Sequence, residues 1–135
     1  MISLTKEQII MLHEKIYDRY GGALGVLNEG MLDSALQAPF QTFGGEELFP
    51  DDKEKIIRLA YGLIKNHSFR DGNKRIGALV LLVLLELNGM HIEASNEEFA
   101  EIIMGIAASE KDDADLAEWV GASASGTMFK RETND

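Results

Sequence analysis

The apolar run at positions 76–85 constrains the fold of this 135-residue chain more than any other part of the sequence. A helix over this run has small or apolar side chains on every side, whereas a helix on a protein surface has a polar face. Glu86 ends the run, which is too short for a membrane span of about 20 apolar residues. The sequence therefore predicts a buried core helix over residues 73–87, ended by Asn88 and Gly89.

Capping signals and apolar periods predict further helices around this segment. Thr5 and Gln8 have the spacing of a capping box, and the helix that follows should run over residues 6–20 until two glycines stop it. Residues 39–50 contain three phenylalanines, two prolines and two glycines without a helical period, which indicates a loop or small hairpin. The remaining helices are expected over residues 28–36, 51–66, 95–109 and 113–120. The predicted fold class is all-α, a helical bundle around the buried central helix.

Length and composition limit the possible functions. The chain is long enough for one domain, which we expect to span residues 1–120, and 45% hydrophobic residues are ample for its core. Residues 121–135 are small, polar and aperiodic, so a disordered C-terminal tail is expected. The absence of cysteine excludes disulfides. A net charge of −10 disfavours direct binding to nucleic acid or an anionic membrane, and without a basic, apolar leader the chain is expected in the cytoplasm.

The segment that enters the central helix concentrates groups suited to phosphate chemistry. We call it the motif segment, and it reads His67, Ser68, Phe69, Arg70, Asp71, Gly72, Asn73, Lys74 and Arg75. Free backbone N–H groups and the helix dipole at the Gly72–Asn73 bend form an anion site, beside which Lys74 and Arg75 add positive charge. Upstream, Ile56, Ala60, Leu63 and His67 are spaced by four, three and four residues, so we expect His67 to prolong the inward face of a helix.

Each of these side chains also has a purely structural interpretation. His67 can accept a proton near neutral pH, but it could equally be a hydrogen-bonded core histidine at a helix C-terminus. Asp71 offers a hard oxygen that could hold Mg²⁺ between nucleotide phosphates, or it could cap the following turn. His13 and His91 lack a comparable context, so we interpret them as structural.

The bend and its cations can be interpreted in the same two ways. Gly72 lets phosphate oxygens approach the backbone, and Asn73 can cap the central helix. Lys74 and Arg75 could simply be a solvated first turn, although cations there are unfavourable by about 0.3–1 kcal/mol, a conflict that a bound anion would remove. Phe69 is expected to anchor the segment to the core, and Arg70 is assigned no role.

The motif segment resembles the signature of the Fic/Doc superfamily, His-x-Phe-x-Asp/Glu-Gly/Ala-Asn-Gly/Lys-Arg. The version of the signature with Lys at the eighth place, as at Lys74, resembles the Doc, or death-on-curing, toxin branch. The resemblance covers roughly residues 1–120, and family-like residues also lie within 21–39, at 60–62 and at 87–89. It implies a Fic/Doc-type helical bundle in which residues 39–50 form a flap that positions a target segment by strand-like pairing.

The resemblance also implies an activity. Doc-like toxins are kinases dependent on Mg²⁺ and ATP that phosphorylate a target hydroxyl, expected to be a threonine of elongation factor Tu, and so block translation. By resemblance, His67 is the general base, Asp71 holds the metal, and Gly72 and Asn73 bind phosphates together with Lys74 and Arg75, which also act in catalysis by stabilising transition-state charge.

Two departures from related enzymes bear on this expectation. Fic enzymes that transfer AMP commonly have Gly in place of Lys74 and a second Arg where this chain has Ala78, so both positions argue against adenylyl transfer. The alternatives are an AMP transferase and a catalytically silent nucleotide- or protein-binding module. The sequence also lacks a convincing internal inhibitory Ser/Thr-x-x-x-Glu-Gly/Asn motif, which implies inhibition by a separate antitoxin protein.

Overall fold

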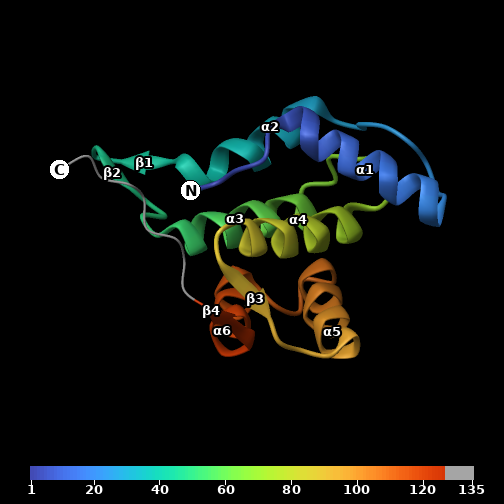
Figure 1. Cartoon of the computed structure of the whole chain (residues 1–135). Helices are drawn as coiled ribbons and strands as arrows, with labels where there is room; N and C mark the ends of the chain where they lie inside the picture. Colours follow the sequence, from blue (N-terminus) through green and yellow to red (C-terminus); the bar gives the residue numbers. More distant parts are fainter. Residues whose placement is uncertain (127–135) are drawn as a thin grey trace.

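The computed structural model describes residues 1–126, which form six α-helices, one short 3₁₀ helix and two small antiparallel sheets (Figure 1). The α-helices are α1 (Lys6–Tyr20), α2 (Glu29–Gln37), α3 (Asp52–Lys65), α4 (Asn73–Leu87), α5 (Asn96–Ala107) and α6 (Asp113–Ser123). The 3₁₀ helix η1 is Ala38–Phe40, and the strands are β1 (Thr42–Phe43), β2 (Glu46–Glu47), β3 (Met90–Ile92) and β4 (Ala124–Gly126). The predicted all-α class is confirmed.

Helix α4 is the buried central helix that the sequence predicts. Figure 1 shows α3 and α4 side by side in the middle layer, with α1 and α2 on one side and α5 and α6 on the other. Ile76, Val80, Leu81, Leu84 and Leu85 of α4 are fully buried, and its other apolar side chains before Glu86 are at least half-buried.

A glycine lets the two central helices approach closely. A Cβ on Gly77 would collide with the side chain of Ile64 and lie 3.0 Å from the carbonyl oxygen of Ala60, so a larger residue would push α4 away from α3. The motif segment joins the end of α3 to the start of α4, so this packing also fixes the distance that the segment spans.

The C-terminal boundary differs from the prediction. Helix α6 continues to Ser123, and β4 pairs with β3 in the register Met90–Gly126, His91–Ser125 and Ile92–Ala124. The prediction of a disordered tail is therefore wrong for residues 121–126, and residues 127–135 lie outside the described part. A three-residue strand is too short to show a period, and its backbone hydrogen bonds depend on a partner strand far away in the sequence.

The hairpin predicted within residues 39–50 is present as β1 and β2. Its base is fixed to the first turns of α3, because the buried Lys55 ammonium donates to the carbonyl of Phe49 and lies 3.2 Å from a carboxylate oxygen of Glu47. Figure 1 shows the hairpin beyond the N-terminal end of α3, whereas the motif segment follows its C-terminal end. Because a 14-residue helix is about 21 Å long, the hairpin lies far from His67. Its pairing with a target segment stays a prediction.

Across residues 1–126, every helix is too short or too polar to cross a membrane.

Candidate active site

His67 leaves helix α3 in a conformation that the sequence did not predict. The helix ends at Lys65, Asn66 is its C-cap, and His67 has φ +50°, in the left-handed region that few residues other than glycine adopt. This turn points the side chain away from the core, so His67 is exposed, and the prediction that it prolongs the inward face is wrong. The core-histidine interpretation is excluded with it. Within residues 1–126 the exposed imidazole has no hydrogen-bond partner, which leaves it free to meet a substrate.

The residues after His67 are held by the segment that precedes α2. The backbone N–H groups of Leu27 and Asn28 donate to the carbonyl of Ser68, at 2.8 and 3.1 Å, and the N–H of Arg70 donates to the carbonyl of Gly25 at 3.0 Å. Phe69, between them, is 1% exposed, which confirms its predicted anchoring role. The motif segment is therefore fixed along one edge by a short antiparallel pairing.

The side chain of Asn73 forms hydrogen bonds within the motif segment and does not cap helix α4. Its side-chain oxygen accepts from the Phe69 N–H and its amide nitrogen donates to the Phe69 carbonyl, both at 3.0 Å. The N-cap of α4 is instead Gly72, with φ +75° and no side-chain cap bond. The predicted capping role of Asn73 is wrong, because its amide bonds the Phe69 peptide four residues upstream. The consequence is an open helix N-terminus, where the first N–H groups can meet an anion.

Asp71 lies at this open end. One carboxylate oxygen accepts from the Gly72 N–H at 2.8 Å, which agrees with the turn-capping interpretation. The other oxygen lies against Gly22, where a Cβ would collide with it. The side chain is still exposed.

This placement fits a metal that is shared with a nucleotide. Mg²⁺ is commonly held by one or two carboxylates, with phosphate and water oxygens completing its coordination. Residues 1–126 contain no cluster of three or more potential metal ligands, so Asp71 would be the protein's contribution and the phosphates would supply further ligands. Both interpretations of Asp71 are compatible with the geometry.

Lys74 and Arg75 are both exposed on the first turn of α4. Within the described residues Lys74 has no hydrogen bond or ion pair, and no carboxylate neutralises Arg75. The guanidinium of Arg75 instead lies over the ring of Tyr20, 4.3 Å from its centroid. Two uncompensated cations at the positive end of a helix favour a bound anion.

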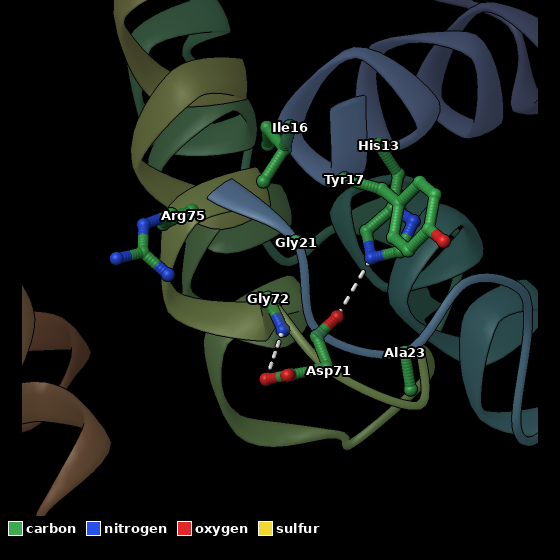
Figure 2. A pocket seen from close by; sticks show the side chains of 8 residues that line it. All are labelled: His13, Ile16, Tyr17, Gly21, Ala23, Asp71, Gly72 and Arg75. Atoms are coloured by element: carbon green, nitrogen blue, oxygen red, sulfur yellow. Dashed lines mark hydrogen bonds between the residues drawn. The ribbon is translucent and has the colours of Figure 1, made fainter. Parts of the chain in front are cut away.

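A buried histidine of helix α1, His13, contacts the motif segment from the core side. The Nε2 atom of His13 lies 2.6 Å from the carbonyl oxygen of Asp71, and its ring stacks on Phe69 with centroids 3.9 Å apart. Figure 2 shows His13 and Arg75 lining a small hollow together with Ile16, Tyr17, Gly21, Ala23, Asp71 and Gly72. His13 has a structural role, as expected, and the residues that it contacts belong to the motif segment.

Sequence reasoning missed the roles of His13 and Tyr20 at this site. The available signal was the apolar face of α1, where His13 stands between Ile9 and Ile16 at helical spacing. A histidine among buried apolar residues needs a hydrogen-bond partner, but the sequence could not say which. His91, the third histidine, pairs with Glu86 on the surface and belongs to no such arrangement.

The sequence of this chain is similar to those of known proteins. The profile of the Fic/DOC family matches residues 3–85, which end inside α4 and include the whole motif segment. A protein of Mycolicibacterium smegmatis named "Toxin Doc" is 33% identical over 108 residues, which are 78% of this chain and 83% of that protein. A protein of Escherichia phage P1 named "Protein kinase doc" is 29% identical over 113 residues, 82% of this chain and 86% of that protein.

Proposed function

Because this chain belongs to the Fic/Doc family, we propose that it is a Doc-like toxin that transfers the γ-phosphate of ATP to a hydroxyl group of a target protein. The observation that carries the proposal is that His67, exposed and without a partner among residues 1–126, lies in the same short segment as the open N-terminus of α4. The relative named as a protein kinase supports transfer of a phosphoryl group. We propose a cytoplasmic location, where ATP and the target are both present.

The residues of the motif segment have different proposed roles in binding and catalysis. The first N–H groups of α4, with Gly72 and Asn73 at the bend, bind phosphate oxygens, and Lys74 and Arg75 stabilise the charge that develops during transfer. Asp71 would hold Mg²⁺, which neutralises phosphate charge when bound. His67 takes the proton of the target hydroxyl as its oxygen attacks the γ-phosphorus. The bond to the β-phosphate oxygen breaks, and ADP leaves.

The target and the regulator follow from the family resemblance. A threonine of elongation factor Tu is the proposed acceptor, and its phosphorylation would block translation. One relative is named a toxin, and the sequence contains no convincing internal inhibitory motif, so we propose a separate antitoxin protein as the second partner. A net charge of −10 argues against direct contact with nucleic acid.

Labelled ATP tests the chemistry directly. The purified protein, freed of antitoxin, is incubated with Mg²⁺, a bacterial lysate and ATP labelled at the γ or the α phosphate, with His67→Ala as control. Kinase chemistry transfers only the γ label and leaves ADP. Transfer of the α label alone would make the protein an AMP transferase, the outcome that Lys74 and Ala78 argue against. Transfer of neither label would favour a silent binding module.

A further inference from the structure

The structure assigns His13 a role as a positioning residue. We propose that it holds the peptide between Asp71 and Gly72 in one orientation and that phosphoryl transfer depends on this orientation. The dependence of phosphoryl transfer on His13 rests on the proposed function, whereas the orientation of the peptide is a property of the free protein.

The contacts of His13 point to a directed hydrogen bond rather than simple core filling. His13 is 2% exposed, and its Nε2 lies 2.6 Å from the Asp71 carbonyl oxygen, which is 58 residues away in the sequence. A carbonyl oxygen only accepts hydrogen bonds, so Nε2 must carry the hydrogen and donate it. The ring is also fixed in its plane by Phe69, on which it stacks with an interplanar angle of 12°.

The hydrogen bond from His13 fixes the peptide between Asp71 and Gly72, whose C=O and N–H groups have different partners. A trans peptide is planar and its C=O and N–H groups point in opposite directions. With the Asp71 carbonyl held inward by His13, the Gly72 N–H must point outward, where it meets the Asp71 carboxylate at 2.8 Å (Figure 2). One donor on α1 therefore determines both the direction of an N–H group at the anion site and the place of the proposed metal ligand.

The conformational freedom of Gly72 explains why the peptide needs the hydrogen bond from His13. With φ +75° and no Cβ, it allows the preceding peptide more orientations than another residue would. The positive φ is what favours glycine here, because a Cβ on Gly72 would lie 3.4 Å from Nε2 and 3.6 Å from the side chain of Ile16, which are ordinary contact distances. The site thus combines a flexible residue with a buried donor that selects one of its conformations.

Three variants separate positioning from packing. His13→Phe keeps the stacked ring and loses the donor. His13→Gln loses the ring and keeps an N–H donor at a similar reach. Ile9→Val removes buried volume from the same face of α1, four residues before His13, and leaves His13 itself in place, so it serves as the matched control. Each is purified as the full chain and assayed for transfer from γ-labelled ATP.

The proposal predicts a specific pattern of kinetics. His13→Phe should lower kcat by about 10- to 100-fold, since a displacement of about 1 Å at a reacting centre has effects of this size, with a change in KM for ATP of less than about 3-fold. His13→Gln should restore most of the lost kcat even if it melts at a lower temperature. Ile9→Val should lower the melting temperature and leave kcat unchanged. Equal losses of kcat in His13→Phe and Ile9→Val, or no loss in His13→Phe, would overturn the proposal.

Nuclear magnetic resonance tests the orientation of the peptide without any transfer reaction. In the wild type, the ¹⁵N shifts of His13 should report a protonated Nε2, and His13→Phe should shift the Gly72 amide resonance and speed its hydrogen exchange. An unprotonated Nε2 would refute the assignment. If the wild type transfers no phosphate while these signals behave as expected, the proposed function fails and the positioning of the peptide stands.

Discussion

The guanidinium of Arg75 lies over the ring of Tyr20, with 4.3 Å between the guanidinium carbon and the ring centroid. This contact joins the last residue of α1 to the first turn of α4. The ring holds the cation beside the helix N-terminus without neutralising it, as a carboxylate would. Arg75 thereby keeps its charge beside the proposed phosphate site.

Tyr20→Ala should weaken binding of ATP by about 2- to 5-fold, because an exposed cation–π contact contributes about 0.5–1 kcal/mol. Isothermal titration calorimetry with Mg²⁺ and ATP measures the change. Tyr20→Phe keeps the ring and is the matched control, for which we expect wild-type affinity. Equal losses in both variants would show that the hydroxyl, not the ring face, matters.

His67→Gly and His67→Ala should both abolish transfer, because each removes the proposed base. Their stabilities should differ. At φ +50° an alanine carries the cost of a left-handed conformation and a glycine does not, so the glycine variant should unfold with a free energy higher by about 1 kcal/mol. Urea denaturation compares the two. A glycine variant less stable than the alanine variant would contradict the backbone conformation, and transfer by either would contradict the catalytic role.

Asp71→Asn should weaken Mg²⁺-dependent binding of ATP and leave binding without metal nearly unchanged. The amide keeps an oxygen that can accept from the Gly72 N–H but loses the charge that would attract the proposed metal. Calorimetry with and without Mg²⁺ distinguishes the two roles of Asp71. Equal losses in both conditions would mean that Asp71 acts only on the turn.

The hydrogen bond and charge of Glu86 raise the pKa of His91 above 6.5. A raised pKa in the folded state means that the pair stabilises the fold below the unfolded-state pKa, and that this contribution disappears as pH rises through the higher folded-state value. An NMR titration should place the His91 midpoint above 6.5, and Glu86→Gln should return it towards 6.5. An unchanged midpoint in Glu86→Gln would refute the pairing.

Local sequence determined the helices and the chemistry of the motif segment. A capping box joins residues three positions apart, so Thr5 and Gln8 mark the start of α1 in the sequence, and the box forms as predicted. The all-apolar run of α4 could only be a core helix, because no arrangement would let it face water. The identity and order of the residues from His67 to Arg75 likewise carried the family resemblance, which the Fic/DOC match confirms.

Tertiary structure decided how those residues are presented. His13 and Asp71 are 58 positions apart, and Tyr20 and Arg75 are almost as remote in sequence, so no spacing rule brings either pair together. The outward turn of His67 arises because α3 ends two residues earlier and the chain must pair with residues 25–28 before α4 begins. Periodicity predicts which side of an element is buried, but contacts between elements depend on how the whole core packs, and that packing placed the donor of His13 under the Asp71 carbonyl.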